Sequence, residues 1–506
     1  KMKEIEQLIE ISQFYGRDSR YVIAGGGNTS YKNADRIWVK ASGASLATIT
    51  EDGFALLDRT KLRPMSEKKY SDDVALREEE VKNDLAAATL TRDKRPSVET
   101  SMHNIIEYAF VVHLHPTLVN ALMCSQQAES MLKKLFGEKA LFVEYTDPGY
   151  VLFKKVEEKI KAFRAAYDEE PHVIWLQNHG IFVAADTIEE IKKIYSDIFS
   201  TLEKSLQKTL PSNETLASHD AEKVIPAVRM MLSTNGLKTL KVRNNPIIAF
   251  FSENVENRKL IAKPFTPDEI VYCKSNYLFF DGNSEETLLR EAETQIPVFI
   301  EKQGYHPHVL LMKGIGLVAA GLNAKQCETI LDVFEDAMKV AYLAQSFGGE
   351  HPMTQNQIDF IDHWEVENYR RSVSTAKSNG RTENKTIVIT GAAQGFGEGI
   401  ARCLVKEGAN IVVADLNEET GRKTAGELNM LCGGNRVVFV KTDVTNIASL
   451  ESLMYDAVCN FGAIDCYISN AGVLRAGGLD EMTPETFDFV TRINYYGYFY
   501  GVKVVS

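Results

Sequence analysis

The chain has 506 residues and a formal net charge of −12. This length exceeds what one hydrophobic core supports, so two or three domains are expected. The acidic balance argues against nucleic acid as a partner. Seven scattered cysteines without a CxxC pair indicate a reducing compartment, the cytoplasm. No apolar run is long enough to span a bilayer, so no membrane association is expected.

The first segment, residues 1–225, alternates helical and strand-like stretches and begins with an amphipathic helix. It contains two glycine-rich turns, Gly25–Ser30 and Ala41–Ala44, and Ser97 lies two residues before Glu99. Backbone N–H groups of glycine-rich turns can converge on phosphate oxygens. We therefore expect a phosphate-binding pocket here.

Three histidines in the same segment predict a metal site. His113 and His115 end a β-branched run, and residues two apart on a strand point to the same face. His179 ends a second apolar run. Three imidazoles with one open position are the arrangement of a catalytic Zn²⁺ site, beside which Glu99 can supply a carboxylate.

These stretches resemble the class II aldolase/adducin superfamily, which includes zinc-dependent aldolases of ketose 1-phosphates. The matching stretches are Ser97 to His103, Val112 to His115 and Gln177 to Gly180. The resemblance implies Zn²⁺ on His113, His115 and His179, with Glu99 as the catalytic acid/base. It also implies a set of phosphate-binding residues: Asn28, Thr29, Ser42, Gly43 and Ser97.

His103 is interpreted as a helix-packing residue rather than a ligand. Related sugar-phosphate epimerases tend to carry Asp at the position of Glu99, which favours an aldolase over an epimerase. A non-catalytic adducin-like scaffold is the other alternative, and the intact ligand set argues against it.

Residues 226–370 contain an internal echo of the first segment. Residues 171–185 align with residues 307–321, and a helical stretch follows each copy. Ile315 stands where the first copy has His179, and isoleucine cannot bind zinc. We therefore expect 226–370 to be a degenerate aldolase-like second unit. The polar residues 371–384 are expected to be a linker.

Residues 385–506 begin with a dinucleotide fingerprint. The strand 386–390 is followed by Gly391, Gln394, Gly395, Phe396 and Gly397, then by a helix, and Asp415 ends the next strand. The glycines let the backbone approach a pyrophosphate at the helix N-terminus. Asp415 can bond both ribose hydroxyls and would repel a 2′-phosphate, which favours NAD over NADP.

This segment resembles the short-chain dehydrogenase/reductase family. The resemblance implies that Asp443 and Val444 contact adenine, and that Asn470, Ala471 and Gly472 line the cofactor. It implies a proton-relay role for Asn494. The family's Tyr-x-x-x-Lys is absent before Ser506, so these residues are expected to form much of an NAD site without the proton donor.

The predicted fold class is α/β. It comprises a class II aldolase-like α/β/α domain, its degenerate second copy, and a Rossmann-type doubly wound parallel sheet that is incomplete at its C-terminus. The order resembles the bifunctional rhamnulose-1-phosphate aldolase/lactaldehyde dehydrogenase family. That resemblance implies a small sugar phosphate as the partner, cleavage to dihydroxyacetone phosphate and lactaldehyde, an NAD-dependent step on the aldehyde, and a homo-oligomer.

Overall fold

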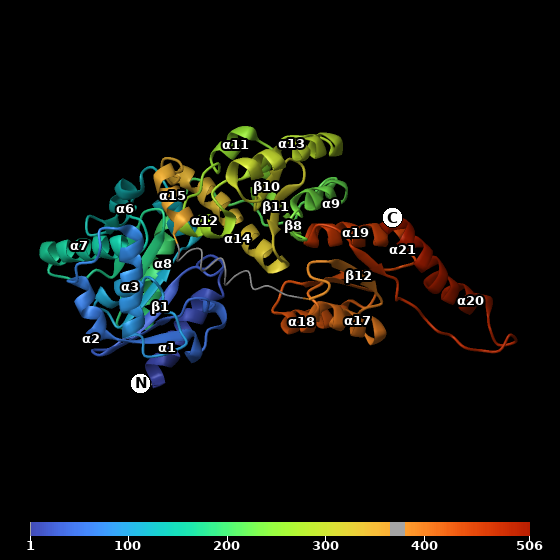
Figure 1. The fold of residues 1–506 in the computed structure, drawn as a ribbon, viewed down its shortest axis with the longest axis horizontal. Helices are drawn as coiled ribbons and strands as arrows, with labels where there is room; N and C mark the ends of the chain where they lie inside the picture. Colours follow the sequence, from blue (N-terminus) through green and yellow to red (C-terminus); the bar gives the residue numbers. More distant parts are fainter. Residues whose placement is uncertain (1, 365–379) are drawn as a thin grey trace. The chain divides into compact units, whose positions relative to one another are not determined.

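The computed structural model describes residues 2–364 and 380–506 (Figure 1). These residues form two compact units. The first unit contains residues 2–211, 259–275 and 332–364, and the second contains residues 212–258, 276–331 and 380–506. Of the expected linker, residues 371–379 lie outside the described residues, whereas residues 381–384 form a turn.

The first unit is built on a seven-stranded sheet in the order β3-β2-β1-β4-β7-β6-β5. Its strands are β1 (Asn28–Lys32), β2 (Arg36–Lys40), β3 (Phe54–Asp58), β4 (Phe110–Leu114), β5 (Leu141–Val143), β6 (Val173–Leu176) and β7 (Gly180–Ala185). The helices are α1 (Met2–Gly16), α2 (Arg59–Leu62), α3 (Val74–Ala88), α4 (Thr100–Ile105), α5 (Thr117–Met123), α6 (Ala128–Phe136), α7 (Tyr150–Tyr167), α8 (Ile188–Ser205), α12 (Pro267–Cys273) and α15 (Gln355–His363).

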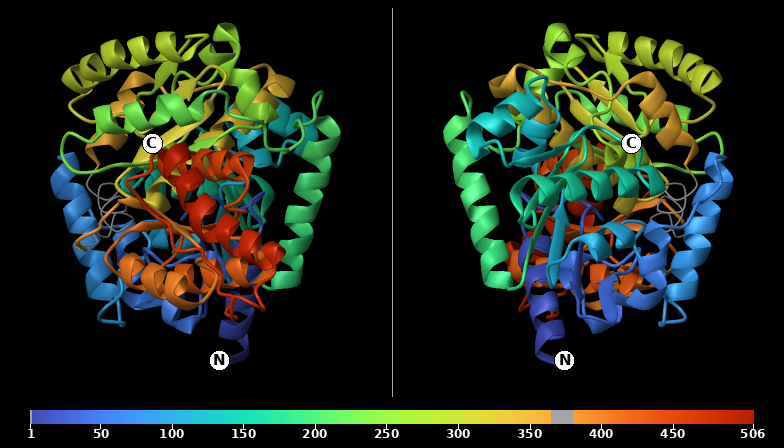
Figure 2. Two further views of the ribbon diagram at one scale, coloured as in Figure 1. Left: turned by 90° about the vertical axis from the view of Figure 1, so that its right-hand side faces the viewer. Right: turned by 90° about the vertical axis from the view of Figure 1, so that its left-hand side faces the viewer.

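Helices cover both faces of this sheet, because its strands are apolar on both sides. Val112 packs with residues of α1, α5 and α8, whereas Val111 packs with residues of α4 and α7. Figure 2 shows α3, in blue, and α8, in green, on opposite sides of the sheet. Since side chains alternate along a strand, His113 lies on the same face as Val111.

The second unit contains a four-stranded sheet that repeats part of the first. Its order is β8-β11-β10-β9, from β8 (Thr239–Arg243), β9 (Leu278–Phe280), β10 (Val309–Met312) and β11 (Gly316–Gly321). The strands pair with the same directions as β4-β7-β6-β5. The pairs Leu176–Gly180 and Met312–Gly316 close equivalent turns. This topology agrees with the repeat seen in the sequence.

The register of the repeat shows which residues of the second copy stand at the positions of the histidines. His113 pairs with Phe182, and the equivalent pair in the second copy is Val242 with Val318. Ile315, at the position of His179, is fully buried in the apolar core of this sheet. Apolar packing residues thus stand in the second copy at the positions of His113 and His179.

The segment 226–370, expected as one unit, is divided between the two compact units. Residues 259–275 and 332–364 join the first because Ile270, Ile361 and Trp364 are buried in a cluster that also includes Val98 and Tyr145. The helices of this segment that lie outside the first unit, or only partly in it, are α9 (Ala221–Leu232), α10 (Pro246–Ser252), α11 (Val255–Lys259), α13 (Glu285–Gln303) and α14 (Ala324–Ala344).

The remainder of the second unit is a parallel sheet with helices between its strands, in the order β14-β13-β12-β15. Its elements are β12 (Thr386–Thr390), α17 (Gly395–Lys406), β13 (Asn410–Asp415), α18 (Glu418–Cys432), β14 (Val437–Lys441), α19 (Ile447–Phe461), β15 (Cys466–Ile468), α20 (Pro484–Thr491) and α21 (Gly497–Val505). This is half of a doubly wound Rossmann-like sheet, so the predicted α/β class is confirmed.

One buried ion pair joins the two sheets of the second unit. Arg229 of α9 is fully buried and binds Asp465, with an Nη2–Oδ2 distance of 2.8 Å. Its guanidinium also donates to the carbonyl of Asn384 at 2.9 Å. Asn384 in turn donates to the carbonyl of Leu322 at 2.6 Å. These contacts fasten the dinucleotide-type sheet to the repeat.

Within the part of the chain that the structure describes, no helix combines the length and the apolar character needed to cross a membrane.

Candidate metal and phosphate site

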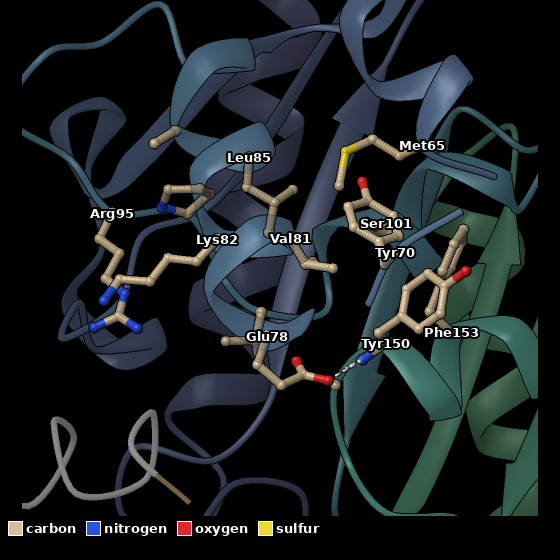
Figure 3. A pocket seen from close by; sticks show the side chains of 14 residues that line it. Met65, Tyr70, Glu78, Val81, Lys82, Leu85, Arg95, Ser101, Tyr150 and Phe153 are labelled. Carbon is tan, nitrogen blue, oxygen red and sulfur yellow. Dashed lines mark hydrogen bonds between the residues drawn. The ribbon is translucent and has the colours of Figure 1, made fainter. Parts of the chain in front are cut away.

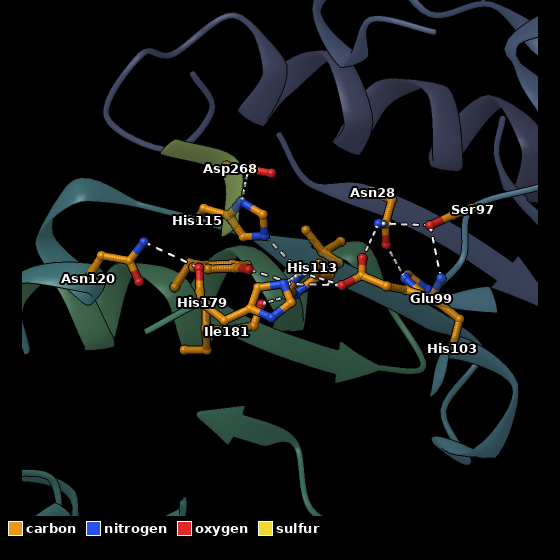
Figure 4. A network of polar contacts seen from close by, with 12 residues as sticks. Asn28, Ser97, Glu99, His103, His113, His115, Asn120, His179, Ile181 and Asp268 are labelled. Atoms are coloured by element: carbon orange, nitrogen blue, oxygen red, sulfur yellow. Dashed lines mark hydrogen bonds and ion pairs between the residues drawn. The ribbon is translucent and has the colours of Figure 1, made fainter. Parts of the chain in front are cut away.

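The three predicted histidines meet at the ends of strands inside the first sheet (Figure 4). His113 is on β4, His115 directly follows it, and His179 lies in the turn between β6 and β7. The Nε2 atoms of His113 and His115 are 2.9 Å apart, and those of His113 and His179 are 3.3 Å apart. One ligand atom from each residue falls within 4.8 Å of the others.

This geometry fits a zinc ion. Zinc–nitrogen distances of about 2.0–2.1 Å in a tetrahedron place ligand nitrogens roughly 3.3 Å apart. The second nitrogen of two of the rings has its own partner: His113 Nδ1 lies 3.0 Å from the carbonyl of Ile181, and His115 Nδ1 lies 2.7 Å from Asp268 Oδ2. Such contacts place the proton on Nδ1 and leave Nε2 as the metal-binding atom.

Glu99 completes the group. It precedes α4, and its Oε1 lies 3.3 Å from His113 Nε2 and 3.2 Å from His179 Nε2. Burial alone would raise the pKa of the Glu99 carboxyl, but the charges and hydrogen bonds of His113 and His179 outweigh it and hold the pKa well below its usual range. Glu99 Oε1 thus lies where the Nε2 atoms of His113 and His179 converge.

Two of the predicted phosphate ligands lie beside Glu99. Asn28 Nδ2 donates to Glu99 Oε2 at 2.5 Å and to Ser97 Oγ at 3.2 Å. The backbone N–H of Glu99 also donates to Ser97 Oγ. The turn with Ser42 and Gly43 reaches the same segment, because Ser42 bonds the carbonyls of the residues just before Ser97. Gly43 has φ +87°, a backbone conformation that favours glycine.

The side chain of Thr29 does not join this group. It is fully buried on the opposite face of β1, where its hydroxyl lies 2.7 Å from that of Ser12 on α1. Alternation along the strand causes this difference, since Asn28 and Ser30 share the face toward Glu99. Of Thr29, therefore, only the backbone lies beside Asn28 on this face, and its hydroxyl is directed to α1.

His103 does more than pack in its helix. Its ring is fully buried, stands edge-on to Phe182, and lies with Nδ1 2.7 Å from Ser30 Oγ and with Nε2 in contact with Asn28 Oδ1. Burial holds the pKa of His103 well below its usual value, so the ring is neutral. A neutral ring that donates to Asn28 Oδ1 turns the Asn28 amide nitrogen toward Glu99.

Two cavities of the first unit flank the site. The smaller, about 40 Å³, lies against His115, and oxygen-bearing side chains in its wall include Asn120, Asp268 and Asp336. The larger, about 130 Å³, is mainly apolar (Figure 3). Pro96, Val98 and Ser101 line it, so this cavity lies behind the segment that carries Glu99.

The second unit brings the predicted dinucleotide residues together. Gly391 and Gly395 have φ of +67° and +63°, and a side chain on Gly397 would collide with the carbonyl of Gly391. Asp415 Oδ2 accepts from the N–H of Ala393 at 3.0 Å, so the carboxylate lies against the glycine loop. Gln394 directly precedes α17. Both Gln394 and Phe396 are exposed to solvent.

Of the later positions of the fingerprint, Asn470 adjoins the same loop, and the others have partners elsewhere in the second unit. Asn470 donates to the carbonyls of Thr390 and Gly391, both at 3.1 Å, which places Ala471 and Gly472 beside the loop. Asn494 exchanges two hydrogen bonds with the backbone of Val473. Asp443 accepts from Thr445 and precedes Val444, against which Gly497 packs.

Comparison with known proteins agrees with this arrangement. Residues 6–203 match the family described as Class II Aldolase and Adducin N-terminal domain, and residues 385–506 match the short chain dehydrogenase family. The chain is a class II aldolase/adducin domain fused to a short-chain dehydrogenase domain. It thus combines a lyase-type with an oxidoreductase-type domain.

Three relatives illustrate the coverage. The Uncharacterized oxidoreductase YuxG of Bacillus subtilis is 25% identical and covers 98% of this chain, which spans 76% of its length. Oxidoreductase UcpA of Salmonella typhimurium is 40% identical over 25% of this chain, which covers 47% of its length. The N-terminal class II aldolase domain of a Thermoplasma acidophilum protein is 25% identical, with a TM-score of 0.35, 40% of this chain covered and 92% of that chain covered.

The sequence did not reveal Asp268. It follows Thr266 and Pro267, which are ordinary residues for the start of a helix, and it lies 153 positions from His115. His103 had a usable signal, because it stands one helical turn after Glu99 and faces the same way.

Proposed function

We propose that the first unit is a zinc-dependent aldolase that cleaves a ketose 1-phosphate. The best candidate substrate is L-rhamnulose 1-phosphate, which would yield dihydroxyacetone phosphate and L-lactaldehyde. The observation that carries this proposal is the convergence of His113, His115 and His179 with the Glu99 carboxylate at 3.2–3.3 Å from two of the rings.

The chemistry divides between the metal and the side chains. A zinc ion held by the three imidazoles would act as a Lewis acid toward the carbonyl and hydroxyl oxygens of the sugar. In the cleavage direction the C3–C4 bond would break, its electron pair would stay with C3, and the C4 oxygen would become the aldehyde oxygen as its proton passes, directly or through water, to the Glu99 carboxylate. Protonated Glu99 would then deliver that proton to C3, which restores the carboxylate.

Phosphate binding would hold the reacting carbons in place. Asn28, Ser97 and the Ser42–Gly43 turn supply an amide, hydroxyls and backbone N–H groups beside Glu99. Binding energy from the phosphate is remote from the bond that breaks, and it can orient C3 against the carboxylate. The acceptor oxygens around the small cavity at His115 suit a neutral, hydroxyl-bearing end of the substrate.

We further propose that the second unit binds NAD and that the complete dehydrogenase acts on the aldehyde product. The glycine loop and the Asp415 carboxylate support this assignment. The chain spans less than half the length of UcpA. The dehydrogenase activity is therefore proposed and not read from the residues of this chain alone.

The test is a cleavage assay on metal-analysed protein with L-rhamnulose 1-phosphate, in which dihydroxyacetone phosphate is measured with a coupled enzyme. Triose phosphate release that requires zinc and is lost in His113→Ala is the expected result. In Glu99→Gln, zinc should remain bound while exchange of the C3 proton of dihydroxyacetone phosphate with solvent falls by about 100-fold or more. Zinc binding without triose release would point instead to an epimerase, and protein without zinc to a scaffold.

A further inference from the structure

A segment far along the chain reaches the metal ligands from outside. Asp268 lies in the first turn of α12, and its Oδ2 is 2.7 Å from His115 Nδ1. The two side chains are 19% and 18% exposed, so water screens the contact only in part. Asp268 lies beyond residues 6–203, the part of the chain that matches the aldolase family.

The backbone around Asp268 is held firmly. Thr266 caps α12 by accepting from the N–H of Glu269, and Glu269 Oε2 accepts from the N–H of Phe265 at 2.8 Å. Asn178, the residue before His179, donates to the carbonyl of Phe265 at 2.9 Å. The same amide donates to the carbonyl of His351 at 2.7 Å.

These contacts link each downstream segment to the loop that carries a metal ligand. Asn178 has φ +54°, an unusual conformation for a residue other than glycine, and its two side-chain bonds to the downstream segments compensate for the strain. The fold thus fixes the position of the Asp268 backbone relative to His115.

The chemistry of the contact differs from that at His113. A backbone carbonyl is the partner of His113 Nδ1, whereas His115 Nδ1 faces a carboxylate. A carboxylate acceptor fixes the proton on Nδ1, orients the ring, and makes Nε2 a stronger donor to a metal than a neutral acceptor does. Gly26 allows the approach, since a side chain there would lie 3.3 Å from Asp268 Oδ2 and 3.4 Å from His115 Nδ1.

We propose that Asp268 is a positioning residue of the metal centre, which holds His115 in the orientation and tautomer that bind the ion. This inference rests on the proposed role of the three histidines as metal ligands. It makes the segment 265–268 part of the site, so that the aldolase-like domain is completed by residues outside its family boundary.

The test is zinc affinity of the full chain, measured by competition with a chromophoric chelator for the wild type, Asp268→Asn and Asp268→Ala. Loss of an outer-shell partner typically weakens metal binding by about 10- to 100-fold. We expect the dissociation constant to rise in the order wild type, Asp268→Asn, Asp268→Ala, because asparagine keeps an acceptor without the charge. Asp359→Asn, an exposed carboxylate on α15 of the same unit, is the matched control and should bind as the wild type does.

A second readout separates orientation from folding. The visible spectrum of the Co²⁺-loaded protein reports ligand geometry, and it should change in Asp268→Asn while tryptophan fluorescence in urea shows an unchanged fold. Wild-type affinity and an unchanged cobalt spectrum in Asp268→Asn would overturn the inference. A wild type that binds no zinc would instead overturn the proposed function, and the inference with it.

Discussion

Replacing Lys32 by methionine is expected to stabilise the first unit at neutral pH. Lys32 ends β1, its side chain is 4% exposed, and its Nζ is a buried atom without a hydrogen-bond partner among the described residues. Burial, aided by the charge of Arg59, lowers the pKa of Lys32 to about 7, although Glu107 and Asp186 oppose the change. Methionine fills a similar volume without a charge.

The size of the effect follows from the pKa. The unfolded chain binds the proton with an ordinary pKa of 10.5, and the folded unit binds it with a pKa of about 7. One pKa unit corresponds to about 1.36 kcal/mol, so the full penalty is on the order of 4–5 kcal/mol. Because the pKa is lowered on folding, this penalty is complete below pH 7 and disappears as the pH rises to 10.5.

The assay is urea unfolding followed by tryptophan fluorescence. All three tryptophans, Trp38, Trp175 and Trp364, are in the first unit, so the signal reports that unit alone. Lys32→Met should exceed the wild type in free energy of unfolding by several kcal/mol at pH 6, and the difference should shrink toward pH 10. Lys134→Met, an exposed lysine on α6, is the control. A difference that is independent of pH, or a less stable variant at pH 6, would refute the reasoning.

Two further predictions concern the sites. Gly180→Ala should weaken zinc binding roughly tenfold, because the new Cβ would lie 2.6 Å from His115 Cδ2 and collide with the carbonyl of Leu114; wild-type affinity in a chelator competition would contradict this. Asp415→Ser should shift nucleotide preference from NADH toward NADPH by about tenfold, since the carboxylate beside the Ala393 N–H is removed. Fluorescence titration with each nucleotide measures it, and an unchanged ratio would argue against this role for Asp415.

The convergence of the three histidines could be predicted from the sequence because they lie in short, regular patterns. Strand alternation alone predicts that His113 and His115 point to the same face. The repeat is predicted from the alignment of residues 171–185 with residues 307–321. The same alternation could have excluded the Thr29 side chain. The contact of Asp268 with His115 could not be predicted from the sequence, because the two residues are 153 positions apart and no local pattern connects them. The division of residues 226–370 was equally hidden, because it depends on which apolar cluster each segment joins.

The buried Arg229–Asp465 pair has a consequence for how this chain can be divided. Cutting before residue 380 would remove Asp465 and the Asn384 carbonyl, and would leave the Arg229 guanidinium without these partners in a place that water does not reach. Removing the degenerate repeat would likewise remove Arg229, the ion-pair partner of Asp465. Truncation at residue 385, where the dehydrogenase match begins, is thus a poor way to isolate that domain, because its sheet and the repeat share this buried pair.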